Sequence, residues 1–172
     1  APSVAGGAST STCNLERRFV FFFLDASPYG LGGVMTQDGV IIAWFACPLT
    51  VDDERIHGCR RGISEGQQIW ESLCLLVALK LWLSAWVDKK VNISIKSDNM
   101  AALSLAAKMK SNVSSLIAKE VALIISKAAF QPRLVVHVPG VMNFSTDSLS
   151  RLEDPDGEYS VPAYLLTSLR TS

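Results

Sequence analysis

The chain has 172 residues, a length that suits one domain and leaves little room for two. Apolar residues make up 49% of the chain, which excludes a disordered tail and a coiled coil. Its 16 basic and 16 acidic side chains balance to a formal charge of +0. This excludes a generally basic coat for nucleic acid but leaves room for a local basic strip.

Cysteine spacing and apolar runs bear on the compartment. No two of the four cysteines are spaced as CxxC, which argues against a zinc ribbon or a disulfide framework and favours reduced thiols. The longest apolar stretch, 73–87, contains Lys80 and Ser84 and is shorter than the ~20 residues of a membrane span. We therefore expect an intracellular protein of the cytoplasm or nucleus with no membrane association.

The first half of the chain predicts three strands and a helix. Residues 1–17 are rich in small and polar types and read as a flexible linker. The apolar run Arg18 to Ala26 predicts a buried strand, and an Asp-Gly turn signal joins the strands expected at 34–36 and 40–46. We expect a loop over 48–62. The long apolar pattern after it predicts a helix from Ser64 to Val87.

The second half alternates strands and helices. Its expected elements are strand 91–96, helix 100–108, helix 116–130, strand 134–138, helix 146–152 and a short helix within 161–169. We divide the chain into a linker (1–17), one domain (18–152) and a C-terminal tail (153–172) with a possible docking helix. The order predicts an α/β fold with a five-stranded mixed sheet, three antiparallel strands followed by two parallel ones, and helices on both faces.

Four acidic residues stand out by their position on these elements. Asp25 and Asp98 each follow an apolar strand, Glu71 lies on the long apolar helix, and Asp147 begins the helix expected at 146–152. Ligands of open α/β sheets collect at the carboxyl ends of strands, so these acids are expected to meet there. Carboxylate oxygens without histidine or cysteine partners favour a hard cation, Mg²⁺ or Mn²⁺. Two such ions would suit displacement at a phosphodiester.

Each acid also has an ordinary structural interpretation. Asp25 precedes Ser27-Pro28 and could be a turn residue. Glu71 could lie on an exposed helix face, Asp98 could cap a helix, and Asp147 could interact with a helix N-terminus. The four positions together, in this order on these elements, favour a shared site.

Four segments resemble the ribonuclease H domains of retroelement polyproteins, of the LTR (gypsy-type) or DIRS-type. FFFLDASPYGLGGV (21–34) resembles the first strand and turn, and WESLCLLVALKLW (70–82) the helix with the catalytic glutamate. IKSDNMAAL (95–103) resembles the fourth strand and its aspartate, and HVPGVMNFSTDSLSR (137–151) resembles the NxxADxLSR segment. The resemblance covers residues 19–152.

This resemblance implies a ribonuclease H-like fold with a catalytic, metal-binding set of Asp25, Glu71, Asp98 and Asp147. It also implies an endonuclease that hydrolyses the RNA strand of an RNA–DNA hybrid with two Mg²⁺ or Mn²⁺ ions, as part of a retrotransposon reverse transcriptase. The partners are then the hybrid and an adjacent reverse transcriptase domain. Further contacts with the hybrid are predicted at Ser27, Asn99, Lys108 and Lys110.

The chain departs from the family where many members carry a histidine after the Pro-Gly turn, because Val141-Met142-Asn143 stand there. We expect this to lower the rate without removing activity. The alternative function is a non-catalytic, domesticated module that acts as a structural or interaction subunit. Trp82 and Trp86, expected to be exposed, would then cover a partner.

Overall fold

A computed structural model describes residues 18–87, 91–97, 115–127, 133–135 and 140–171, and these form an α/β fold around one mixed sheet. The sheet has six strands in the order β5-β4-β1-β2-β3-β6. The mixed α/β sheet agrees with the prediction, whereas the expected number of five strands does not. The sixth strand is the two-residue β6 (Leu169–Arg170), which is too short for a periodic sequence signal.

The first three strands form an antiparallel meander. β1 (Arg18–Ala26) pairs with β2 (Gly30–Gln37), which pairs with β3 (Val40–Pro48). The β2–β3 turn contains Asp38 and Gly39, both with positive φ, as the Asp-Gly signal predicts. β4 (Val91–Lys96) runs parallel to β1, and β5 (Arg133–Val135) runs parallel to β4. The carboxyl ends of β1 and β4 therefore lie at the same end of the sheet.

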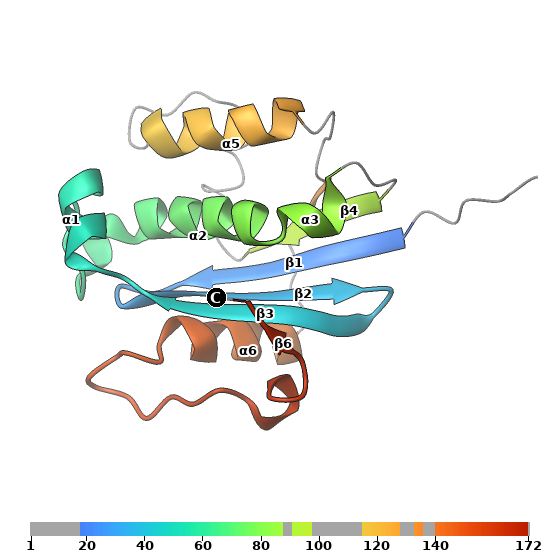
Figure 1. The fold of residues 1–172 in the computed structure, drawn as a ribbon. Helices are drawn as coiled ribbons and strands as arrows, with labels where there is room; N and C mark the ends of the chain where they lie inside the picture. The colour runs from blue at the N-terminus through green and yellow to red at the C-terminus, as the bar shows by residue number, and fades with distance from the viewer. Residues whose placement is uncertain (1–17, 88–90, 98–114, 128–132, 136–139, 172) are drawn as a thin grey trace, which may run out of the picture.

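Helices cover both faces of the sheet (Figure 1). α2 (Gln67–Leu81), α3 (Leu83–Trp86) and α5 (Ser115–Lys127) lie on one side, and α6 (Gly140–Ser150) lies on the other. The helix expected over 64–87 is divided into the 3-10 turn η1 (Ser64–Gly66), α2 and α3. α6 begins six residues before the helix expected at 146–152.

A short helix, α1 (Val51–His57), lies within the segment expected to be a loop. Thr50 caps it: its Oγ1 accepts from the Asp53 backbone N–H, while the Asp53 carboxylate accepts from the Thr50 N–H. Gly58 ends the helix in the left-handed conformation. The capping box formed by Thr50 and Asp53 can be recognised in the sequence, but the polar composition of the segment led to the prediction of a loop.

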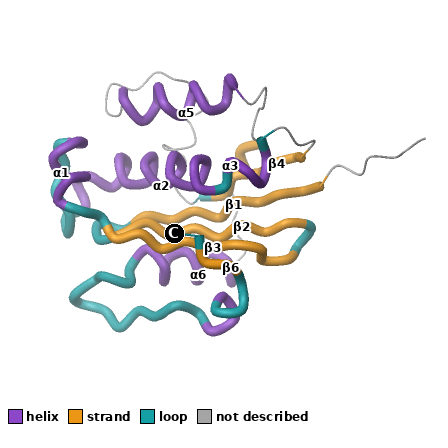
Figure 2. Tube along the Cα trace, viewed as in Figure 1, coloured by secondary structure: helices purple, strands orange, loops and turns teal. Residues whose placement is uncertain are grey.

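The segment after α6 returns along the sheet and ends beside β3 (Figure 2). It contains η2 (Ala163–Leu165) and β6, which pairs parallel to β3. The Trp44 indole N–H donates to the Leu165 carbonyl at 2.8 Å, and the Thr171 N–H donates to the Trp44 carbonyl at 2.8 Å. The division of the chain at residue 152 stays a prediction, but the residues beyond it contact the sheet.

Among the described residues, the larger of two hydrophobic clusters fills the space between the sheet and α2. Trp82 and Trp86, expected on the surface, are each only 2% exposed. The Trp82 ring packs against Phe22 at 4.9 Å and Phe45 at 5.3 Å between centroids. The expectation of exposed tryptophans was wrong. Both side chains belong to the core cluster that the sheet, α2 and α5 form together.

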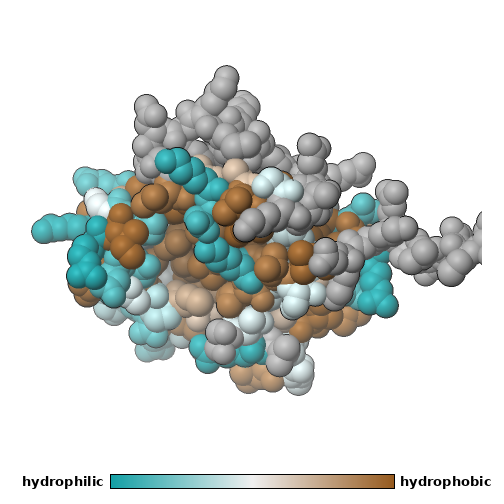
Figure 3. Space-filling view, turned by 45° about the horizontal axis from the view of Figure 1, so that its top comes forward, coloured by the Kyte–Doolittle hydropathy of each residue, from teal (hydrophilic) through white to brown (hydrophobic). Residues whose placement is uncertain are grey.

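Apolar and polar residues are interspersed on the face shown in Figure 3. The exposed large apolar side chains come from many elements, among them Phe19, Val40, Ile56, Leu123, Phe144 and Leu166. Single exposed apolar residues are normal for a folded protein. None of the described helices is long and apolar enough to cross a membrane.

Candidate active site

Asp25 lies near the carboxyl end of β1 and is 7% exposed. Its cross-strand partner is Gly32 on β2. The Ser150 hydroxyl on α6 donates to Asp25 Oδ2 at 2.6 Å. Asp25 is therefore a buried carboxylate held by a helix of the other layer, a placement that a simple turn residue would not have.

Glu71 is the second buried carboxylate, 4% exposed, and comes from α2 on the opposite face of the sheet. Gln67, one turn earlier, donates its Nε2 to Glu71 Oε1 at 3.0 Å and also to the Ala26 carbonyl at the end of β1. Ser97, directly after β4, donates its hydroxyl to Glu71 Oε2 at 3.5 Å. These contacts fix Glu71 beside the ends of β1 and β4, so it is not an exposed helix residue.

The sequence predicted Asp147 at the start of a helix, but the residue lies well inside α6. Arg151, one turn later, donates its Nε to Asp147 Oδ1 at 2.6 Å. The Arg151 guanidinium also lies 3.7 Å from Asp154 and 5.9 Å from the centre of the Tyr159 ring. Asp147 is more open than the other two acids, since its side chain is 42% exposed.

Close packing of α6 on β2 brings Ser150 to Asp25. A Cβ added at Gly32 would lie 2.6 Å from the Thr146 carbonyl oxygen and 2.7 Å from the Ser150 nitrogen. One added at Gly30 would lie 2.8 Å from the Ser150 carbonyl oxygen. The two glycines therefore let the helix backbone approach the strand directly.

Electrostatics connect the three acids. Burial raises the pKa of the Cys74 thiol well above its usual value, and the charges of Glu71 and Asp25 raise it further. The hydrogen bond with Asp147 raises the pKa of Arg151, and the charge of Asp25 adds to this effect. The charges of Glu71 and Asp25 thus both act on the Cys74 thiol, and those of Asp147 and Asp25 both act on the Arg151 guanidinium.

The remaining predicted site residues lie outside the described part of the chain. They are Asp98, Asn99, Lys108 and Lys110. Within the described residues, no group of three or more histidine, cysteine, aspartate or glutamate side chains is placed to hold a metal ion. Asp25, Glu71 and Asp147 are among the residues searched, so their described positions do not by themselves form a three-carboxylate metal site. Their carboxylate oxygens are nevertheless the ligand type that Mg²⁺ and Mn²⁺ prefer.

Ser27, predicted to contact nucleic acid, is fully buried. Its hydroxyl donates to the Ser150 carbonyl at 2.6 Å and accepts from the N–H groups of Tyr29 and Gly30, each at 3.1 Å. This placement gives Ser27 a role within the turn after β1, and its contact with a hybrid stays a prediction.

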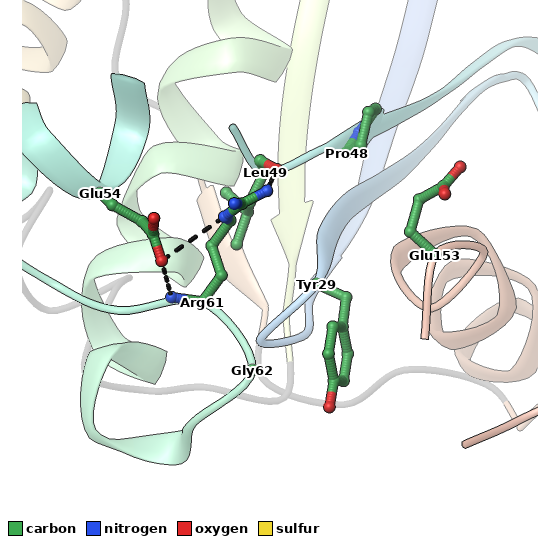
Figure 4. Close-up of a pocket in the computed structure, with 7 residues that line it drawn as sticks. All are labelled: Tyr29, Pro48, Leu49, Glu54, Arg61, Gly62 and Glu153. Carbon is green, nitrogen blue, oxygen red and sulfur yellow. Dashed lines mark hydrogen bonds and ion pairs between the residues drawn. The ribbon is translucent and has the colours of Figure 1, made fainter. Parts of the chain in front are cut away.

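A cleft of about 410 Å³ lies beyond the same turn, where Tyr29, Leu49, Arg61 and Glu153 are among the lining residues (Figure 4). Arg61 is directed toward Glu54 and Leu49: its Nε lies 3.5 Å from Glu54 Oε1, and its Nη1 donates to the Leu49 carbonyl at 2.8 Å. Because this arginine is engaged and two carboxylates line the cleft, it is a poor candidate for binding phosphate.

Gln67, Ser97 and Ser150 were missed at the sequence level. Gln67 precedes Glu71 by four residues, a spacing that places both on one helix face and could have been noticed. Ser150 belongs to the LSR motif, but nothing in its spacing indicates contact with a residue 125 positions away.

Comparisons with known proteins support the fold. No family model matches the chain, and no curated protein matches it. Among solved structures, the chain is similar to LC11-RNase H1, isolated from compost by a metagenomic approach, with 16% identity, a TM-score of 0.53, and coverage of 77% of this chain and 91% of that one. It is also similar to LC11-RNase H1 in complex with an RNA/DNA hybrid, with 16% identity, a TM-score of 0.52, and coverage of 77% and 93%. The chain therefore has a fold like that of RNase H1.

Proposed function

We propose that the chain is a metal-dependent endonuclease that hydrolyses the RNA strand of RNA–DNA hybrids. The observation that carries the proposal is the pair of buried carboxylates, Asp25 and Glu71, at the carboxyl end of β1. Burying two ionised acids is costly unless a partner compensates their charge. The likeness to RNase H1, one neighbour of which is bound to an RNA/DNA hybrid, supports the choice of substrate.

Asp98 completes the proposed metal-binding set of Asp25, Glu71 and Asp147. In the parallel pairing of β1 and β4, Phe23 is opposite Lys96. Asp25 follows Phe23 by two residues, as Asp98 follows Lys96 in the sequence. This equal spacing supports a shared position for the two acids at the end of the sheet.

Divalent cations held by these acids would supply an activated water and stabilise the leaving oxygen of the phosphodiester. The chain's own contribution is to orient the carboxylates. Ser150 fixes one oxygen of Asp25, while Gln67 and Ser97 each fix one oxygen of Glu71. Arg151 holds Asp147 from the adjacent turn of α6.

We further propose that the domain is part of a retroelement reverse transcriptase, on the basis of the NFSTDSLSR segment at 143–151. A neutral domain offers few phosphate contacts, and these contacts provide most of the salt-dependent affinity for nucleic acid. An adjacent reverse transcriptase domain would supply the additional phosphate contacts, and so the additional affinity for the hybrid. The alternative of a non-catalytic module loses its support from exposed tryptophans, since Trp82 and Trp86 are buried.

The test is cleavage of a labelled RNA–DNA hybrid with Mg²⁺ or Mn²⁺, beside duplex DNA of the same sequence. We expect metal-dependent cutting of the RNA strand that Glu71→Gln and Asp98→Asn reduce to background. Asp52→Asn is the matched control, because Asp52 is exposed on α1 and pairs only with the neighbouring Arg55 in the described structure. The chain is also assayed fused to a reverse transcriptase. Absence of cutting in both forms, together with no metal binding by calorimetry, would refute the proposal.

A further inference from the structure

Ser150 connects α6 to the end of β1 by two hydrogen bonds. Its hydroxyl donates to Asp25 Oδ2 at 2.6 Å, and its backbone carbonyl accepts from the Ser27 hydroxyl at 2.6 Å. Ser27 is in turn held by the N–H groups of Tyr29 and Gly30. The turn after β1 therefore fixes the backbone of Ser150, and the side chain of Ser150 fixes the carboxylate that precedes the turn.

The hydroxyl of Ser150 has two acceptors within reach. The Asp147 carbonyl lies at 3.0 Å, as is usual for a serine bonding back along its own helix. The contact with Asp25 is shorter and involves an ionisable acceptor, and bonds to charged groups are the stronger kind. Both partners are buried, with Ser150 only 1% exposed, so water competes poorly for this bond.

The same helix also carries Asp147, three residues before Ser150. One rigid element thus provides one proposed metal ligand and orients a second. Since the glycines at positions 30 and 32 place the backbone of α6 against β2, the Ser150 hydroxyl has little freedom to move away from Asp25.

From these contacts we infer that Ser150 is a positioning residue for the Asp25 carboxylate and sets the affinity of the site for divalent cations. The inference rests on the proposed function, since it assigns Asp25 as a metal ligand. Ser150 orients a ligand and does not touch the substrate. Groups that hydrogen-bond metal ligands typically change metal affinity or activity by about 10–100-fold when removed.

The experiment is calorimetric titration of Mn²⁺ into the wild type, Ser150→Ala and Ser150→Thr, with hybrid cleavage measured in parallel. We expect Ser150→Ala to bind Mn²⁺ about 10–100-fold more weakly. Ser150→Thr, which keeps the hydroxyl, should recover most of the affinity. Ser148→Ala is the matched control: Ser148 is also buried on α6, and within the described residues it donates to no carboxylate.

The outcomes separate the inference from the proposed function. If the wild type binds Mn²⁺ and cuts the hybrid while Ser150→Ala binds equally well, the inference is wrong and the function stands. If the wild type binds no Mn²⁺ and cuts the hybrid neither alone nor fused to a reverse transcriptase, both are wrong. Urea unfolding verifies that each variant is folded. Should Ser150→Ala not fold, Ser27→Ala removes the anchor of the Ser150 carbonyl instead, and an unchanged Mn²⁺ affinity in that variant would overturn the inference.

Discussion

Gly32→Ala tests whether direct contact between α6 and β2 builds the site. The added Cβ would meet the Thr146 carbonyl oxygen at 2.6 Å, the Ser150 nitrogen at 2.7 Å and the Leu149 Cβ at 2.8 Å. Two of these atoms are helix backbone, so no side-chain rotation relieves the contact, and α6 must move away from the strand. Overpacking of this kind costs about 1–3 kcal/mol. Removing the flexibility of a strand glycine returns roughly 0.5–1 kcal/mol.

The two terms leave a net decrease in the free energy of unfolding of up to about 2.5 kcal/mol, and we expect a loss near the middle of that range, about 1 kcal/mol, in urea denaturation. Cleavage of the hybrid should fall further than the loss of folded protein explains, because Ser150 and Asp147 move with the helix. Gly33→Ala is the control: its added Cβ meets the Phe45 ring in the core cluster beside α2, so it should cost stability and spare metal affinity. A Gly32→Ala variant with wild-type stability and activity would refute the reasoning.

Three further predictions concern neighbouring residues. Burial raises the pKa of the Cys74 thiol above 9.0, so the unfolded chain releases this proton at a lower pH than the folded chain. The free energy of unfolding should therefore decrease as the pH rises above about 9. Cys74→Ala should show a shallower decrease in urea titrations at several pH values, and an equal slope would contradict the assignment. Trp82→Ala should destabilise the protein by about 3–5 kcal/mol in the same urea assay, because it removes a buried ring that packs on Phe22 and Phe45. A loss below about 1 kcal/mol would argue against this packing. Arg151→Met should change the free energy of unfolding by no more than about 1 kcal/mol, because both side chains of the Arg151–Asp147 pair are over a third exposed and water screens the interaction. A much larger loss would show that Arg151 has a structural role beyond this pair.

Hydrophobic pattern carried much of the fold prediction. The run from Arg18 to Ala26 predicted β1 with its observed bounds, and the Asp-Gly signal located the hairpin between β2 and β3. Elements without such patterns were missed. α1 has no buried residue, so its sequence shows no apolar stripe, and only its capping box marks it. Trp82 was misjudged because its contacts, Phe22 and Phe45, come from strands far away in sequence.

The candidate site divides in the same way. The acids could be proposed from sequence because each occupies a definite position on its predicted element. Their supporting contacts could not, since they depend on how layers pack: Ser150 reaches Asp25 across 125 residues, and this requires two glycines to admit α6. Helix spacing could have indicated Gln67 beside Glu71, whereas its second contact, with the Ala26 carbonyl, depends on the placement of α2 over β1.

Burial argues against the ordinary interpretations of Asp25 as an exposed turn residue and of Glu71 as an exposed helix residue. A turn residue or an exposed helix residue keeps its carboxylate in water, where ionisation costs nothing. These two carboxylates are 7% and 4% exposed, and both raise the pKa of the same buried thiol. Protein side chains orient them by hydrogen bonds from Ser150, Gln67 and Ser97, all neutral donors. Neutral donors add no positive charge, so the divalent cation that we propose for this end of the sheet is what would compensate two ionised carboxylates there.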